Sequence, residues 1–276
     1  MDVIERTELL PPGPALALGA LLGVPVPDLD RGAGLPLLWH WIYLLERPAQ
    51  ADLGPDGHPI RGAVPEPPGP GHRRMWAGGR VRVDGLLRCG ESATRRTRIL
   101  SVQEKHGRSG PLTFYVVGHQ ILQRNQVVID EQQDIVYREP APAPVHGRES
   151  TSSVEDPEVP AARGEWVIDT SPTLLFRFSA LTYNAHRIHY DRDYARDVEG
   201  YPGLLTHGPL QALAMAEAAR AAGSEGGGFF EYRLTAPLFD HQGMVVKATL
   251  DQEVTTTAVR DRYGRQTASG TLRGAD

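Results

Sequence analysis

The chain contains 276 residues, 40% of them hydrophobic and 23% charged, with a formal net charge of −5. This length leaves room for one large domain or two medium ones, and the composition is that of an ordinary globular protein. The slightly acidic balance gives no reason to expect a nucleic-acid partner. A single cysteine, Cys89, excludes an intramolecular disulfide and fits a reducing cytoplasm.

The N-terminus, MDVIERTELL, lacks a basic region ahead of an apolar stretch. No window of the chain approaches about 18 uninterrupted apolar residues. We therefore expect a cytoplasmic protein that neither is secreted nor has a membrane partner.

The first half combines one apolar segment with a strand-rich region. Residues 35–47, LPLLWHWIYLLER, are predicted to form a buried helix. Residues 52–72 are crowded with Pro and Gly, which predicts a long surface loop or flap. The runs that follow are rich in Val, Ile, Thr and aromatic residues and are separated by short turns. They predict an antiparallel meander over residues 76–87, 92–104, 112–123 and 127–137.

Residues 139–164 are rich in Pro, Ala, Ser and acidic residues, and are predicted to link two domains, residues 1–138 and 165–276. In the second domain we expect a strand over residues 174–181, a helix over 208–222, and strands over 229–237, 243–256 and 258–272. A helix followed by a meander thus occurs twice. The order predicts an α+β protein of two similar domains, with two antiparallel sheets or one continuous sheet.

Three polar side chains, Asn184, His186 and His189, gather in a six-residue window that we place at a strand end. Polar residues on such a loop can converge on a pocket. His207 and Gly208 then lead directly into the helix predicted over residues 208–222. The first backbone N–H groups of a helix have no internal partners and carry partial positive charge, so they could hold a developing oxyanion.

The run FSALTYNAHRIHYD at residues 178–191, with THGP at 206–209, resembles the signature of the MaoC-like, or hydratase-2, hot-dog enzymes. Residues 35–45, 73–80, 103–112 and 131–139 resemble its FAS1-like dehydratase branch. That branch comprises hydroxyacyl-thioester dehydratase type 2 proteins and includes mesaconyl-C4-CoA and 3-methylfumaryl-CoA hydratases. The resemblance implies a double hot-dog fold, in which each half wraps around a long helix. It also implies that the C-terminal half carries the active site, while the N-terminal half shapes the acyl pocket.

The resemblance implies a hydro-lyase that adds water to, or removes it from, an acyl thioester of CoA or an acyl-carrier protein, without a metal or redox cofactor. His189 aligns with the catalytic histidine of the family and would act as general base. The N–H of Gly208 would bind the thioester carbonyl. Asn184 stands where the family has a catalytic aspartate, and would orient the water or the β-hydroxyl. His186 would supply the proton transfer that the missing aspartate leaves vacant.

The candidate substrate-binding residues are Tyr183, Arg187, His207, Arg74 and Arg80. Arginine forks match both CoA phosphates and a second substrate carboxylate. Each of the five also has an ordinary alternative role, namely packing, an ion pair, anchoring of the helix start, or surface charge. The pattern His186-x-x-His189 is a weak metal motif, because it lacks a helix and a general-base glutamate.

Two other functions stay open. Hot-dog folds also include thioesterases. A catalytically inactive thioester-binding subunit is the second alternative, because the amide of Asn184 cannot take up a proton. A homodimer is compatible with either function, and the acyl group, its carrier and the direction of the reaction stay open.

Overall fold

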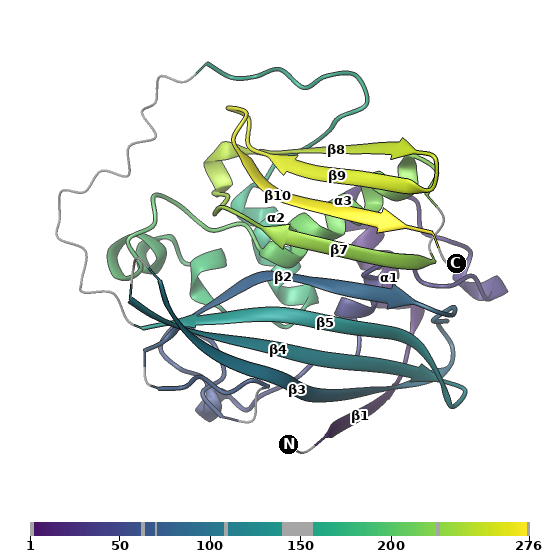
Figure 1. Cartoon of the computed structure of the whole chain (residues 1–276), viewed down its shortest axis with the longest axis horizontal. Coiled ribbons are helices and arrows are strands. Elements are labelled where there is room, and N and C mark those ends of the chain that lie inside the picture. Colours follow the sequence, from purple (N-terminus) through teal and green to yellow (C-terminus); the bar gives the residue numbers. More distant parts are fainter. Residues whose placement is uncertain are drawn as a thin grey trace.

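The computed structural model describes residues 3–61, 64–69, 71–107, 110–139, 157–224 and 227–274. Within these ranges, ten strands form a single antiparallel sheet in the order β1-β3-β4-β5-β2-β7-β10-β9-β8-β6 (Figure 1). The N-terminal half contributes β1 (Ile4–Leu9), β2 (Arg73–Val83), β3 (Ser92–Gly107), β4 (Gly110–Gln123) and β5 (Gln126–Arg138). The C-terminal half contributes β6 (Trp166–Ile168), β7 (Gly228–Leu234), β8 (Met244–Asp251), β9 (Val254–Arg260) and β10 (Gln266–Arg273). Of the two predicted arrangements, two antiparallel sheets or one continuous sheet, the continuous sheet is the one observed.

The two halves meet where β2 pairs with β7. Val81 and Phe230 face each other in this ladder, and both side chains are fully buried. Side chains from both halves therefore share one hydrophobic core.

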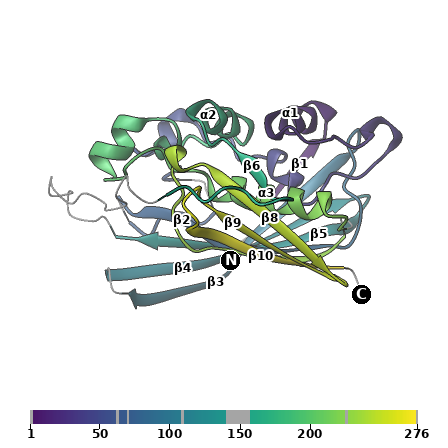
Figure 2. The ribbon, with the colours of Figure 1, turned by 90° about the horizontal axis from the view of Figure 1, so that it is seen from above.

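In the parts of the chain that the structure describes, three α-helices cover one face of the sheet (Figure 2): α1 (Pro12–Leu22), α2 (Pro172–Leu181) and α3 (Gly208–Ala221). Helix α3 lies against β8, β9 and β10, and α1 contacts α2. Leu213 and Met215 of α3 are fully buried against the sheet, as expected for the central helix of the C-terminal half. Short helical turns connect these elements: η1 (Leu29–Arg31), η2 (Trp39–Ile42), η3 (Gln50–Asp52), η4 (Arg187–His189), η5 (Tyr194–Val198) and η6 (Asp240–Gln242).

The helix predicted over residues 35–47 is wrong. Only η2 is helical there, and Leu38 and Leu44 adopt left-handed backbone angles that interrupt a regular helix. The indole N–H groups of Trp39 and Trp41 donate to acceptors on different elements. Trp39 Nε1 donates to Glu217 of α3 at 2.7 Å, whereas Trp41 Nε1 donates to Glu131 of β5 at 2.8 Å. These partners lie on different layers, so the segment bridges them as an irregular turn.

The strand predicted over residues 174–181 is also wrong, because this segment is helix α2. Ser171 caps the helix by accepting a hydrogen bond from the N–H of Leu174, and Pro172 occupies the first turn. A short apolar run does not distinguish a strand from a helix, whereas this cap does.

The remaining strand predictions need one correction. The four strands predicted in the first half match β2 to β5, and the helix predicted over residues 208–222 matches α3. The region predicted to contain the last three strands contains four. Turns at Gln252 and around Gly264 separate β8, β9 and β10, which follow β7. Most of the predicted linker, residues 140–156, lies outside the described residues. None of the helices in the described parts of the chain has the length and apolar character that a membrane span requires.

Candidate active site

A cavity of about 990 Å³ lies between the end of α2, the start of α3 and the sheet of the N-terminal half. All four predicted catalytic residues line it, and so do Tyr183 and Arg74. The structure therefore brings together the cluster that the sequence placed on one loop and the helix start some 20 residues later in the sequence.

The cluster begins where α2 ends, not at a strand end as predicted. Tyr183 adopts a left-handed turn, and the N–H of Asn184 donates to the carbonyl of Ser179 at 2.8 Å. The side-chain Oδ1 of Asn184 accepts the N–H of His186 at 3.0 Å. This bond occupies the amide oxygen, so the amino group of Asn184 is the donor that remains for a ligand.

His189 presents one free ring nitrogen to the cavity. Its Nδ1 lies 2.7 Å from the carbonyl oxygen of Leu205, and a carbonyl can only accept, so Nδ1 carries the proton. The Nε2 atom of the neutral ring is then an acceptor. Burial lowers the pKa of His189 to about 4, although the bond to Leu205 opposes this shift. The imidazole is therefore neutral, and able to accept a proton, at physiological pH.

The position of Leu205 is fixed by its neighbours. The N–H of Leu204 donates to Asp240 at 3.0 Å, and the N–H of Thr206 donates to Leu238 at 2.7 Å. Asp240 is buried and forms an ion pair with Arg192. The carbonyl that sets the tautomer of His189 is thus held by bonds on both sides.

Gly208 offers a free backbone donor at the start of α3. Pro209 has no N–H, and the N–H groups of Leu210 and Gln211 both donate to the carbonyl of His207. In the first turn of α3, only the N–H of Gly208 lacks an acceptor among the described residues. A Cβ at this position would lie 2.2 Å from Cδ1 of Leu234, so only glycine allows the start of α3 to pack this closely against Leu234.

Two further histidines surround His189. The ring of His207 stacks on it with centroids 3.6 Å apart, and its Nε2 hydrogen-bonds to Ser179 at 2.8 Å. His207 does not line the cavity, and it supports the catalytic ring from behind. The ring of His186 does line the cavity, with its centroid 5.4 Å from that of His189. Burial, together with the charges of His58 and His189, lowers the pKa of His186 well below its ordinary value.

His58 is a cavity residue that the sequence analysis missed. It lies in the loop predicted as a surface flap, and its ring centroid is 4.1 Å from that of His186. The loop is docked onto the catalytic segment, because the N–H of Arg187 donates to the carbonyl of Asp56 at 2.8 Å. The only sequence signal was a histidine between turn-forming residues, in GPDGHP, and such a signal does not show that a loop folds back.

The other predicted binding arginines point elsewhere. Arg187 donates to Asp191 at 2.8 Å and stacks over the ring of Tyr194, and it does not line the cavity. Arg80 donates to both carboxylate oxygens of Asp134, at 2.8 and 2.9 Å, also outside the cavity. The ion pair of Arg187 was its alternative interpretation, whereas Arg80, for which surface charge was the alternative, forms an ion pair as well.

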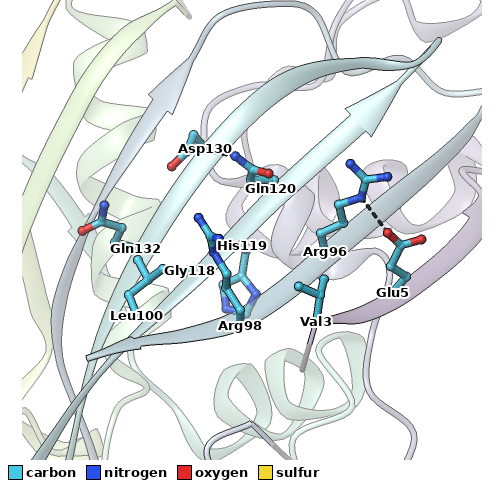
Figure 3. Close-up of a pocket in the computed structure, with 10 residues that line it drawn as sticks. All are labelled: Val3, Glu5, Arg96, Arg98, Leu100, Gly118, His119, Gln120, Asp130 and Gln132. Atoms are coloured by element: carbon cyan, nitrogen blue, oxygen red, sulfur yellow. Dashed lines mark hydrogen bonds and ion pairs between the residues drawn. The ribbon is translucent and has the colours of Figure 1, made fainter. Parts of the chain in front are cut away.

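A second hollow of about 430 Å³ lies elsewhere on the N-terminal half (Figure 3). It is lined mainly by polar side chains of β3, β4 and β5, and Arg96 pairs there with Glu5 at 2.7 Å. It contains none of the predicted site residues. Among the described residues, no three His, Cys, Asp or Glu side chains are grouped so that they could hold a metal ion.

Comparison with known proteins shows which family the chain belongs to. The model of the hydroxyacyl-thioester dehydratase type 2 family matches residues 38–240. The chain belongs to this family. The chain is 50% identical over 227 residues to mesaconyl-C(4)-CoA hydratase of Chloroflexus aurantiacus. The aligned region covers 82% of this chain and 79% of that protein. A mitochondrial hydroxyacyl-thioester dehydratase type 2 of Schizosaccharomyces pombe is 41% identical over 80 residues, 28% of this chain and 27% of that one. The chain is accordingly an acyl-thioester hydratase/dehydratase, a hydro-lyase, as the sequence predicted.

Solved structures agree with the fold of this family. A MaoC-like dehydratase from Phytophthora capsici superposes with a TM-score of 0.73 at 14% identity, over 100% of this chain and 95% of that one. A Mycobacterium tuberculosis protein described as having a double hot-dog fold gives a TM-score of 0.57 at 16% identity, over 98% and 94% of the two chains. The predicted double hot-dog fold is confirmed, apart from the missing central helix of the N-terminal half.

Proposed function

We propose that this enzyme adds water to a short, branched 2-enoyl thioester, of the kind named for its mesaconyl-C(4)-CoA relative, and that His189 is the base. The observation that carries this proposal is the position of the His189 ring. Its Nδ1 is bonded to Leu205, and it shares the cavity with the unpaired N–H of Gly208. A base and an oxyanion donor in one cavity are what the addition of water to an enoyl thioester needs.

In the proposed hydration step, the oxygen of water bonds to the β carbon while its proton passes to Nε2 of His189. The electron pair of the double bond moves to the thioester oxygen, where the N–H of Gly208 stabilises the enolate. The α carbon then takes up a proton, returned by His189 or relayed through His186. Asn184 donates its amino hydrogens to the attacking water, and dehydration is the reverse.

The direct test is to follow the ultraviolet absorbance of the enoyl thioester with purified protein and a panel of short, branched and dicarboxylic substrates. Replacement of a general base costs about 10²–10⁴ in rate, so His189→Ala should lose at least about a hundredfold in kcat. An equal rate in the variant would contradict the assignment of the base. Release of free thiol from the thioester would instead favour the thioesterase alternative.

We further propose CoA as the carrier, a homodimer as the assembly and the cytoplasm as the location. Comparing matched CoA and acyl-carrier-protein thioesters tests the carrier, and light scattering tests the assembly. We also propose that no redox cofactor takes part, because the addition of water involves no net change of oxidation state. We propose that no metal takes part either, since no three His, Cys, Asp or Glu side chains are grouped to hold one within the described residues. Activity should then survive dialysis against a chelator.

A further inference from the structure

Arg74, which lines the cavity, has no carboxylate partner among the described residues. Its side chain is half-buried, and its Nε is buried without an acceptor. The Nε of Arg95, which also lines the cavity, is buried in the same way, but Arg95 forms an ion pair with Glu46 at 3.2 Å. Because a buried donor without an acceptor is costly, the position of Arg74 suggests that a ligand supplies the anion.

The third arginine of the cavity, Arg138, likewise has a buried Nε and no ion pair among the described residues. It is paired in the sheet with Arg73, which forms an ion pair with Glu199 at 2.7 Å. Burial raises the pKa of Glu199, while the charges of Arg73 and Arg138 lower it, so the charge of Arg138 is partly balanced by this carboxyl group. Arg74 instead shares the cavity wall with His58, His186 and His189.

His58 shares the surroundings of Arg74. Both side chains line the same cavity, and burial, followed by the charge of Arg74, lowers the pKa of His58 well below its ordinary value. No ring nitrogen of His58 or His186 has a hydrogen-bond partner in the described parts of the chain, although both side chains line the cavity. A neutral imidazole has one N–H to donate, so His58 can add a hydrogen bond to an anion held by Arg74.

The ring of His58 is held in place by the close approach of its loop to the catalytic segment. A Cβ on Gly57, whose φ is +86°, would lie 1.9 Å from the carbonyl oxygen of Ala185. Arg187 also donates to the carbonyl of Pro55 at 3.0 Å. The loop therefore delivers His58 to one place beside His186.

The anion at this place belongs to the acyl group. The whole pantetheine arm separates the phosphates of CoA from the thioester, so a side chain beside the catalytic histidines reaches the acyl carbons and not the phosphates. A mesaconyl-type thioester carries a carboxylate on its β carbon, the atom that receives the oxygen of water. The arginine and the base would then act on neighbouring atoms of the substrate.

We propose that Arg74 and His58 form the receptor for a carboxylate on the β carbon, so that the enzyme selects carboxylated enoyl thioesters over uncharged analogues. This inference rests on the proposed function. An uncharged acyl group would leave the buried Nε of Arg74 without an acceptor, which selects against such a group. Each hydrogen bond to a charged group should contribute about 10- to 100-fold in discrimination.

The test compares mesaconyl-C4-CoA with 3-methylcrotonyl-CoA, in which a methyl group replaces the carboxylate. The unaltered enzyme should prefer the carboxylated substrate in kcat/KM. Arg74→Met should lose about 10- to 100-fold for the carboxylated substrate and much less for the uncharged one. Arg74→Lys should keep part of the preference because it keeps the charge. His58→Leu should reduce the preference more than His58→Gln, which retains an N–H donor.

Arg82→Met is the matched control, because Arg82 lies on the same strand and pairs with Asp84 at 3.2 Å outside the cavity. It should leave the preference unchanged. Equal losses for both substrates in Arg74→Met, or no preference in the unaltered enzyme, would overturn the receptor.

Binding of saturated analogues separates the receptor from the reaction. The C4 thioester of methylsuccinate (here methylsuccinyl-CoA), with methyl and carboxylate both on the β carbon, differs from isovaleryl-CoA by the same carboxylate-to-methyl change. The Kd values of these two analogues need no turnover. Tighter binding of methylsuccinyl-CoA that is lost in Arg74→Met would support the receptor even if no substrate were hydrated. In that case the proposed function alone would fail. Equal Kd values for the two analogues would overturn the receptor while leaving the hydratase function intact.

Discussion

His189 combines burial with a fixed tautomer, and both affect its response to pH. Burial lowers its pKa to about 4, so the ring stays neutral through most of the acidic range. If the neutral ring is the base, kcat/KM should stay level from neutral pH down to about pH 5 and fall only near pH 4. A pH–rate profile checks this prediction. An acidic limb near pH 6.5, the ordinary value for histidine, would contradict it.

The same pKa shift predicts a loss of stability in acid. In the unfolded chain His189 titrates near 6.5, whereas in the folded protein it titrates near 4. Between these values the unfolded state binds more protons, so stability rises with pH and falls as pH drops from 6.5 to 4. This site alone contributes about 3 kcal/mol across that window. The Tm in calorimetry should fall over this range, and less so in His189→Gln. An equal fall in the variant would place the effect elsewhere.

Replacement of Asn184 by aspartate tests whether an acid at the position of the family aspartate would raise the activity of this enzyme. Its oxygen already accepts the N–H of His186, a role that an aspartate would retain. Asn184→Asp would add a negative charge beside the proposed carboxylate receptor, so kcat/KM for a carboxylated substrate should fall about tenfold or more. Steady-state kinetics on carboxylated and uncharged thioesters checks this. A gain with the carboxylated substrate would contradict the prediction.

Much of the site could be predicted at the residue level because its main residues lie on one short segment and one helix start. Asn184, His186, His189 and Gly208 all line the cavity. His58 could not be predicted, because its place depends on a loop that returns from the other half of the chain. The sequence also does not show that Arg187 forms an ion pair with Asp191, since that pairing depends on the local turn.

At the scale of elements, α3 is tied to the irregular segment that replaces the predicted helix. Glu217 of α3 accepts the indole N–H of Trp39, and both side chains are buried. Glu217→Ala would leave this N–H without an acceptor, which should reduce the free energy of unfolding by about 1–3 kcal/mol. Urea unfolding checks this, with Glu217→Gln as a variant that keeps an acceptor oxygen. Equal losses in both variants would contradict the assigned role of this bond.

The two elements that the sequence predicted wrongly fail for different physical reasons. For α2 the deciding signal is local, because Ser171 and Pro172 form a helix start that a strand would not have. Around Trp39, the partners lie far away in sequence, on α3 and β5. Tertiary bonds of this kind override a helical apolar pattern, and no local signal shows them. The long strands of the first half succeed because each has a clear pattern bounded by turns.

On the scale of the whole molecule, both halves contribute to one site. The N-terminal half provides the loop that carries His58, and this loop depends on the close contact of Gly57 with Ala185. Gly57→Ala should displace the loop, because both the positive φ and the contact oppose a side chain. We expect lower kcat/KM with a retained global fold, together with faster hydrogen exchange in the loop. Unchanged activity would contradict the view that the docked loop completes the site.

The most direct test of the account is a crystal structure of the protein with a saturated, unreactive acyl-CoA. We expect the thioester oxygen to lie about 2.7–3.1 Å from the backbone nitrogen of Gly208. We also expect the β carbon to face Nε2 of His189. A thioester bound with its carbonyl away from the start of α3, or with Nε2 of His189 turned from the acyl carbons, would contradict it.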